Sequence, residues 1–189
     1  MITFETVLVS LVVVAAFLWF FRSSRVALKK PDVGTVYFVK AGRNSWFHKI
    51  GMTARPFRER KQELLRTHND GKPVHEVALI RNLPFAWDVE QYFHKRISKT
   101  RYHLKGRRDN PNTANRGKEF YVLKTASDVD FFLATLERAV DDVRRVAKRR
   151  GRWPDGADER VSLVVWRGGK PSAPILLYAD HVDHREAAE

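Results

Sequence analysis

The chain has 189 residues, 43% of them hydrophobic and 30% charged, which is enough for one domain of ordinary size plus shorter appendages. Lysine and arginine number 35 against 22 aspartate and glutamate, and the net charge of +13 favours a polyanionic partner, either nucleic acid or an anionic lipid surface. The absence of cysteine excludes disulfide bonds and every cysteine-ligated zinc site.

The chain opens with an apolar run, residues 6–21, that contains one internal serine. As a helix this run would span about 24 Å, so the residues from Met1 onward must help to cross a hydrocarbon core of about 30 Å. Basic residues follow the run and none precedes it. We therefore expect residues 1–22 to form a transmembrane anchor of a single-pass membrane protein, with the C-terminal domain in the cytoplasm.

Three other interpretations of this run stay open. A cleaved signal peptide would carry a basic start and a small-x-small cleavage site, and neither is visible. A buried core helix would usually carry a polar stripe, which this run almost entirely lacks. The run could also reflect an incorrectly chosen start. Residues 23–33 then form a basic linker, whose charges anionic lipid could hold.

The following residues predict one α/β domain, residues 34–124. Strands are expected where β-branched and aromatic residues gather between turn residues, at 35–40, 46–50, 74–81 and 120–123. The second and third are separated by a helix over 56–67, and a further helix is expected over 85–98, where apolar residues recur at helical spacing. We expect a small central three-stranded sheet flanked by these helices.

An extension, residues 125–180, follows the domain. We expect Ser127 to cap a helix that runs to about Arg150. Strands at 161–166 and 175–178 flank a Gly-Gly turn, which is typical of a β-hairpin. Residues 181–189 then form a polar tail.

The segment 95–118 is strongly basic, with nine lysines and arginines against one aspartate. Tyr102 and His103 lie among the cations. This mixture indicates a surface that follows a phosphate backbone, and the alternative is a solvated insertion.

Short motifs follow one another in a defined order over residues 34–123. They are Gly34-Thr35-Val36-Tyr37, Lys49-Ile50-Gly51-Met52-Thr53, Arg60-x-x-x-Leu64, Val89-Glu90-x-x-x-His94 and Lys118-Glu119-Phe120-Tyr121. In this order and spacing they resemble the GIY-YIG nuclease superfamily, and most closely its phage-type DNA-binding branch, also called the meiotically up-regulated gene type. The resemblance implies a GIY-YIG-like fold and a site that acts on DNA.

The resemblance also implies a role for each of five residues. Tyr37 takes the place of the first motif tyrosine, and Lys49 stands where the second motif usually has tyrosine. Arg60 matches the arginine that contacts the scissile phosphate, and Glu90 matches the carboxylate that holds one divalent metal, Mg²⁺ or Mn²⁺. His94 orients Glu90 or contacts phosphate. An ordinary structural role, such as core packing for Tyr37 or a salt bridge for Glu90, is the alternative at each position.

Phosphodiester hydrolysis needs a base to activate water, a cation to stabilise added negative charge, and a metal. One carboxylate can hold Mg²⁺ because this ion keeps several waters and takes phosphate oxygens as further ligands. The planar, permanently charged fork of arginine suits phosphate. A tyrosine can act as base only when its pKa falls from about 10, and we infer that Lys49 lowers the pKa of Tyr37.

The leading prediction is a membrane-anchored, metal-dependent endonuclease acting on DNA. Its nucleic-acid-binding residues are expected to be Arg58, Lys61, Lys95, Arg96, Lys99, Arg101, Lys105, Arg107, Arg108 and Lys118. A membrane-tethered DNA-binding module without catalysis is the second hypothesis, and a structural protein whose basic surface binds anionic lipid is the third. No small-molecule cofactor is expected.

Overall fold

The structure, a computed structural model, describes residues 28, 32–42, 46–67, 73–98, 100, 102 and 120–178. Its helices are α2 (Phe57–Thr67), α3 (Ala86–Ile97) and α4 (Ala126–Arg149). Its strands are β1 (Val33–Ala41), β2 (Phe47–Thr53), β3 (Val74–Pro84), β4 (Phe120–Val122), β5 (Ser162–Arg167), β6 (Lys170–Pro171) and β7 (Ile175–Leu176). Their chain order follows the sequence-based prediction.

The described strands form a seven-stranded sheet, so the prediction of a three-stranded sheet is wrong. The strand order is β4-β2-β1-β3-β5-β6, with β7 also paired to β5, and all of the pairings are antiparallel. The expected strands β2, β1 and β3 are its centre. The sheet is larger because β4 pairs with β2 and β5 pairs with β3. The expected hairpin of the extension forms through the pairing of β5 with β7, and it joins the domain's own sheet.

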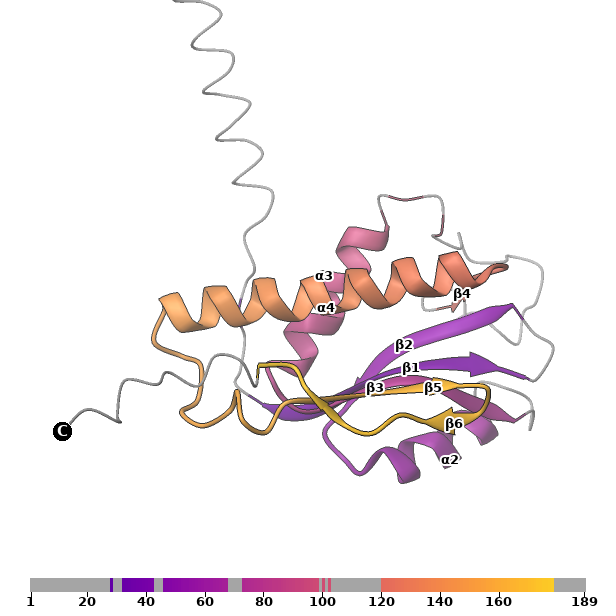
Figure 1. The fold of residues 1–189 in the computed structure, drawn as a ribbon, viewed down its shortest axis with the longest axis horizontal. Coiled ribbons are helices and arrows are strands. Elements are labelled where there is room, and N and C mark those ends of the chain that lie inside the picture. Colours follow the sequence, from indigo (N-terminus) through magenta and orange to yellow (C-terminus); the bar gives the residue numbers. More distant parts are fainter. Residues whose placement is uncertain are drawn as a thin grey trace, which may run out of the picture.

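The helices divide between the two faces of the sheet. Figure 1 shows α3 and α4 on one side and α2 on the other. Alternate residues of β1 point to opposite faces, so Val36 and Phe38 enter the core under α3 and α4, whereas Tyr37 and Val39 pack with Leu64 of α2. The face covered by α2 therefore receives Tyr37, the first residue of the predicted site.

The two long helices bury the faces that their sequences predict. In α3 the expected apolar stripe, Ala86, Val89, Phe93 and Ile97, is fully buried. The N-cap of helix α4 is Thr125, two residues before the expected cap at Ser127. The side chains of Thr125 and Asp128 each accept a hydrogen bond from the other's backbone N–H, which forms a capping box.

Strand β3 continues to Pro84, past its expected end at residue 81. Asn82 takes a left-handed conformation, with φ of 55°, and the pairing register between β1 and β3 shifts at this level. Beyond the shift, Leu83 and Pro84 still pair with the start of β1. Phe85 is also left-handed and buried, and it sets the direction in which α3 leaves the sheet.

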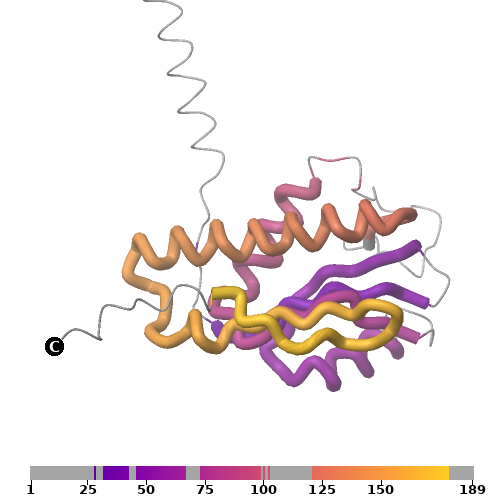
Figure 2. The backbone as a smooth tube through the Cα atoms, viewed as in Figure 1, coloured from indigo at the N-terminus to yellow at the C-terminus, as the bar shows by residue number. Residues whose placement is uncertain are grey.

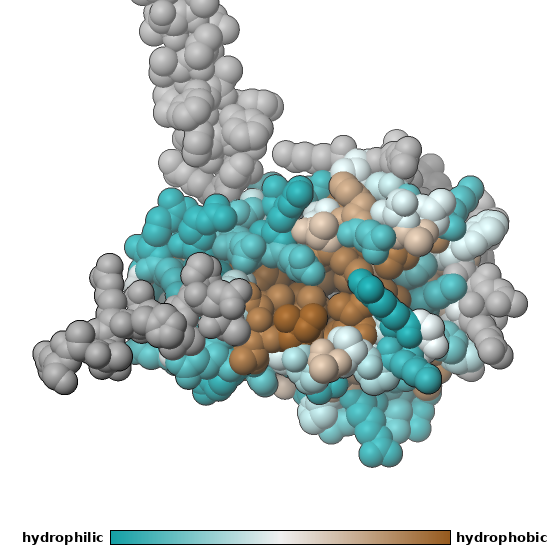
Figure 3. Space-filling model, viewed as in Figure 1, coloured by the Kyte–Doolittle hydropathy of each residue, from teal (hydrophilic) through white to brown (hydrophobic). Residues whose placement is uncertain are grey.

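The C-terminal strands lie against the centre of the sheet. Figure 2 shows the β5–β6 hairpin running beside β3, although the two are far apart in sequence. Figure 3 shows a hydrophobic area between α4 and the strands on this side of the molecule. Two side chains of β7, Ile175 and Leu176, are about half exposed.

The predicted membrane localisation is not upheld. Within the part of the chain that the structure describes, no helix is both long enough and apolar enough to cross a membrane. The expected anchor, residues 1–22, lies outside the described residues, as do most of the linker and the tail 181–189.

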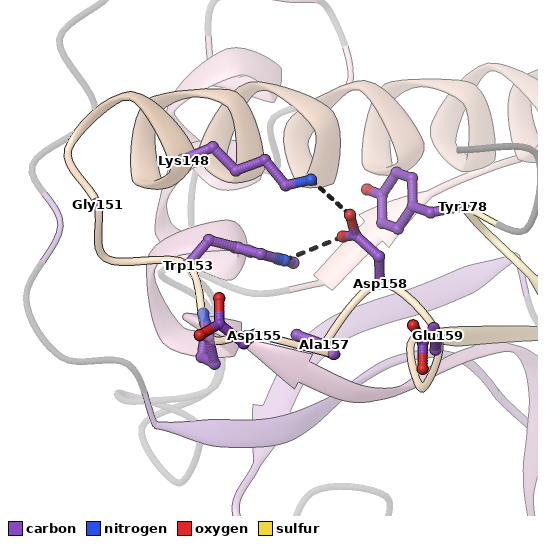
Figure 4. Close-up of a pocket in the computed structure, with 10 residues that line it drawn as sticks. Lys148, Gly151, Trp153, Asp155, Ala157, Asp158, Glu159 and Tyr178 are labelled. Carbon is purple, nitrogen blue, oxygen red and sulfur yellow. Dashed lines mark hydrogen bonds and ion pairs between the residues drawn. The ribbon is translucent and has the colours of Figure 1, made fainter. Parts of the chain in front are cut away.

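An aspartate joins the end of α4 to the loop before β5 (Figure 4). Asp158 accepts hydrogen bonds from Arg144 Nε at 2.7 Å, Lys148 Nζ at 2.6 Å and Trp153 Nε1 at 3.0 Å. It lines a cavity of about 540 Å³ together with Trp153 and Tyr178. Partial burial acts to raise the pKa of Asp158, but the hydrogen bonds from Arg144 and Lys148 prevail and lower it to about 2.

We expect Asp158→Asn to destabilise the fold by about 2 kcal/mol at pH 7, because the carboxylate loses its charge-assisted hydrogen bonds. A lowered folded-state pKa contributes stability above the unfolded pKa of about 4, and this contribution disappears as the pH falls through about 2. Denaturant unfolding at pH 7 and pH 2.5 measures the effect, with Asp155→Asn in the same loop as control. An equal loss at both pH values would contradict the assignment.

Candidate active site

The site begins at Tyr37, which stands in the centre of the sheet and is 1% exposed. Its ring lies directly over Gly51, its partner on β2. A Cβ at Gly51 would lie 2.6 Å from Tyr37 Cζ, closer than two carbon atoms can approach. The glycine of the second motif is therefore needed to let the tyrosine ring lie across β2.

Arg60 reaches the same hydroxyl from helix α2. Its Nε donates a hydrogen bond to Tyr37 Oη at 3.3 Å, and its Nη1 donates to Glu63 Oε1 at 2.5 Å. The other Glu63 oxygen accepts from Arg55 Nη2 at 2.8 Å. Two edges of the guanidinium are thus fixed, and its Nη2 makes no hydrogen bond within the described residues.

Lys49 lies on the same face of the sheet as Tyr37 and is 2% exposed. It opposes Val39, so Lys49 and Tyr37 are diagonal neighbours on adjacent strands. Burial above all, and then the cation of Arg60, lower the pKa of Lys49 to about 8, although the charge of Glu90 acts in the opposite direction. A lysine in such surroundings costs stability, which is typical of a functional position.

We expect the folded chain to gain about 2 kcal/mol of stability between pH 7 and pH 9.5 from Lys49. A lysine whose folded pKa is lowered to about 8 releases its proton before the unfolded chain does, so stability rises through this range. The variant Lys49→Met should lack that rise, whereas Lys61→Met should keep it. Urea unfolding at the two pH values measures the change in the free energy of unfolding for each variant. An equal change in wild type and Lys49→Met would contradict the prediction.

Glu90 approaches the cluster from α3. It is 9% exposed, and its charge acts on the pKa values of Tyr37, Lys49 and Tyr121. Strand β4 pairs only with residues 47–49 of β2. Within the described residues, the part of β2 that follows Lys49 therefore has no neighbouring strand on the edge where β4 lies. Helix α3 contacts both β1 and β2. Glu90 thereby shares one electrostatic environment with residues from three strands.

His94 follows Glu90 by one helical turn. Its Nε2 lies 3.7 Å from Glu90 Oε1, and its Nδ1 lies 2.5 Å from the Tyr121 hydroxyl. The His94 and Tyr121 rings stack at 5.9 Å. Burial and the charge of Glu90 raise the pKa of Tyr121, so its hydroxyl keeps its proton and can donate it to His94 Nδ1. This bond directs Nε2 toward Glu90.

One inference from the sequence is wrong. Lys49 does not lower the pKa of Tyr37, because burial raises that pKa and only the hydrogen bond and charge of Arg60 counteract it. The phenol therefore holds its proton more firmly than a solvent-exposed tyrosine. Tyr37 is better suited to orienting a water molecule than to deprotonating one.

The residues present fit a metal with few protein ligands. Within the described residues there is no group of three or more histidine and acidic side chains that could enclose an ion. Glu90 is the carboxylate beside Tyr37 and Lys49, with His94 Nε2 next to it. A site with one carboxylate suits Mg²⁺, which retains water and takes phosphate oxygens.

The predicted nucleic-acid-binding residues fall into three groups. Arg58 and Lys95 are exposed. Lys61 and Arg96 form ion pairs, with Glu76 at 2.6 Å and Asp142 at 2.9 Å. The others, Lys99, Arg101, Lys105, Arg107, Arg108 and Lys118, lie outside the described residues.

Two residues of the cluster were not singled out from the sequence as site residues. Glu63 fixes Arg60, and its position three residues later on the same helix was a usable signal. Tyr121 orients His94, and it was part of a motif that was quoted for resemblance alone. Their partners became visible only when the helices were placed beside the sheet.

Comparison with known protein families gives one match. A family model, the T5orf172 domain, matches residues 34–149, which is more than half of the chain and includes the whole cluster. This phage-associated domain is related to nucleases of the GIY-YIG and HNH-like kinds. No curated protein and no solved structure matches the chain. The chain belongs to the T5orf172 domain family.

Proposed function

We propose that the chain is a metal-dependent endonuclease that hydrolyses phosphodiester bonds of DNA, in the phage-type branch of the GIY-YIG nucleases. Its family relationship suggests a nuclease-like module that acts on DNA. The observation that carries the proposal is the meeting of Tyr37, Lys49, Arg60, Glu90 and His94 in one cluster. Two strands and two helices contribute to it.

Arg60 is the group that would receive the scissile phosphate. Tyr37 and Glu63 already hold its Nε and Nη1, so its Nη2, which has no hydrogen-bond partner in the described part of the chain, is presented without further ordering. Side chains fixed before the substrate arrives stabilise the charge that develops on a phosphate at little reorganisation cost. The side chain of Arg60 is 19% exposed, which leaves it within reach of DNA.

Tyr37 and Lys49, the two buried side chains beside Arg60, would orient and deprotonate the attacking water. The Tyr37 hydroxyl keeps its proton and can orient the attacking water. Lys49, with a pKa of about 8, is the group in this cluster that can accept a proton near neutral pH. Both side chains lie on the face of the sheet that Arg60 closes.

Glu90 would hold Mg²⁺ or Mn²⁺, with His94 positioning its carboxylate. When bound, such an ion neutralises charge on the phosphate oxygens and the leaving group. The contact between Tyr121 and His94 supports this assignment. Tyr121 holds one ring nitrogen of His94, and the other ring nitrogen therefore lies beside Glu90.

A DNA-binding module without catalysis is the second candidate. It is favoured by the burial of Tyr37 and Lys49, which are 1% and 2% exposed and so have little surface for a substrate. Binding would then depend on Arg60 and on exposed cations such as Arg58 and Lys95.

Closed circular plasmid DNA separates the two candidates. The full 189-residue chain is incubated with plasmid and Mg²⁺ or Mn²⁺, and EDTA serves as the control. Nicked or linear product that requires the metal supports the nuclease. Intact plasmid together with a salt-dependent gel shift would support the binding module instead.

A further inference from the structure

Helix α4 carries exposed charges in two separate stripes, in each of which the residues repeat at i, i+7 and i+11. Acidic residues form one stripe, and arginines form the other eight residues later, which turns it about 80° around the helix axis. The buried residues of α4 face the core, so both stripes lie on the outer surface of the helix. The acidic stripe is Asp130, Glu137 and Asp141, and the arginines, which we call the basic stripe, are Arg138, Arg145 and Arg149.

The two stripes face different neighbours. Asp141 of the acidic stripe accepts a hydrogen bond from the Tyr178 hydroxyl at 3.0 Å, on the side of α4 that faces the C-terminal segment. On the other side, Arg145 Nη1 lies 3.3 Å from Asp142 Oδ1, and the same carboxylate accepts a hydrogen bond from Arg96 of α3 at 2.9 Å. The basic stripe therefore follows the side of α4 that faces α3.

The positive charge of the basic stripe is only partly compensated. Asp142 is shared by Arg96 and Arg145, and within the described residues no ion pair joins Arg138 or Arg149 to a carboxylate. Arg145 and Arg149 are one turn apart, a spacing at which like charges destabilise a helix. The helix dipole favours Arg149, which lies in the last turn, but does not extend to Arg138. An anionic partner would compensate the remaining charge.

The spacing of the basic stripe suits the backbone of double-stranded DNA. Arg138 and Arg149 are separated by about 17 Å along the helix axis, and B-form DNA carries about ten phosphate charges over such a length. The planar guanidinium of arginine forms paired hydrogen bonds with phosphate oxygens. Because α4 is a continuous helix of 24 residues, the three side chains extend from a backbone that is already ordered.

The basic stripe and Arg60 lie on opposite sides of the sheet. Figure 1 shows α4 over one face of the sheet and α2, which carries Arg60, over the other. The stripe is on the surface of α4 that points away from the sheet. A straight duplex that lies along one of these outer surfaces does not reach the other. A DNA contact at the stripe would therefore be separate from the candidate active site.

We propose that the basic stripe is a second DNA-binding surface, which holds the phosphate backbone of duplex DNA on the side of the sheet opposite Arg60. This inference rests on the proposed function only for the identity of the polyanion as DNA. Contacts to phosphates carry no sequence information, so the stripe binds duplexes of different sequence equally well. One segment of duplex is held at α4 while another lies at Arg60.

The test is equilibrium binding of the full chain to two labelled duplexes of unrelated sequence, without divalent metal so that neither is cut. The triple variant Arg138→Gln, Arg145→Gln and Arg149→Gln removes the three cations and keeps residues that favour a helix. Because three phosphate contacts are lost, we expect both affinities to fall about 10- to 100-fold at about 100 mM salt. The slope of log K against log salt concentration should become shallower by about 2 to 3.

Two further variants separate the stripe from net charge and from misfolding. The first removes the same charge from exposed cations of β3, β5 and β6, and should bind duplex within about 3-fold of wild type, because salt screens distant charges. It carries Arg81→Gln, Arg167→Gln and Lys170→Gln. The second keeps the charge of the stripe and should bind within about 5-fold of wild type, because lysine also binds phosphate. It carries Arg138→Lys, Arg145→Lys and Arg149→Lys.

Several outcomes would overturn this surface. These are a wild type that does not bind duplex at low salt, a stripe glutamine variant that binds as wild type does, equal losses in the two glutamine variants, and a loss confined to one of the two sequences. Reduced binding to phosphatidylserine vesicles with duplex affinity unchanged would show that the stripe contacts anionic lipid instead. Failure of plasmid cutting with the stripe effect intact would overturn only the nuclease proposal.

Discussion

Replacement of Glu90 by glutamine should reduce metal-dependent cutting of DNA at least about 100-fold, because the ion supplies several kcal/mol of transition-state stabilisation. Glutamine keeps nearly the same shape but removes the negative charge that would hold a divalent ion. Because Glu90 lies beside the buried Lys49, its loss also leaves that cation with less compensation. The rate with saturating Mg²⁺, measured at several metal concentrations, shows whether the ion is still bound.

The matched control is Glu76→Gln, which removes the carboxylate of the Lys61 ion pair outside the cluster; the side chain of Glu76 is 20% exposed and that of Glu90 is 11% exposed. Its rate should stay within about 3-fold of wild type, since partly exposed ion pairs contribute little. DNA binding by Glu90→Gln should be retained, which separates lost chemistry from lost folding. If Glu90→Gln cuts DNA as fast as Glu76→Gln, Glu90 does not hold a metal.

The second large effect is expected for Arg60→Lys, which should slow cutting about 100-fold or more, the usual consequence of losing one preorganised donor to developing charge. Lysine keeps the positive charge, but its single ammonium cannot contact Tyr37, Glu63 and a phosphate in the planar geometry of the guanidinium. Single-turnover rates and duplex affinity are compared. Affinity should change less than about 5-fold, because one charge–phosphate contact survives.

Arg66→Lys on the same helix serves as the control, because it makes the same exchange at an exposed arginine outside the cluster. It should leave the rate unchanged. Equal losses of rate and affinity in Arg60→Lys would instead indicate that Arg60 only binds DNA. Such a result would favour the non-catalytic module.

Much of the fold was predictable because local signals and tertiary packing agree. The β-branched and aromatic residues of β1 and β2 and the apolar stripe of α3 are mostly buried in the structure, so these local signals were enough to locate the three elements. The resemblance then placed Tyr37, Arg60 and Glu90, and the structure brings these residues into one cluster.

The rest depended on contacts between distant segments. The sheet is wider than expected because β5, more than 75 residues beyond β3, pairs with it, and no local pattern specifies a strand's neighbour. The end of β3 was misplaced because proline can occupy a sheet position whose N–H is not needed. The pKa of Tyr37 was inferred with the wrong sign, because the sequence shows nearby cations but not the burial that dominates it.

The central claim is that the cluster of Tyr37, Lys49, Arg60, Glu90 and His94 cuts DNA with the help of a metal. The most direct measurement is the single-turnover rate on a labelled DNA with the full chain in excess, since this removes any dependence on product release. Wild type and Glu76→Gln, prepared identically, should cleave with Mg²⁺, and Glu90→Gln should not. Cleavage that is equal in all three, or absent from wild type while the DNA remains bound, would contradict the account.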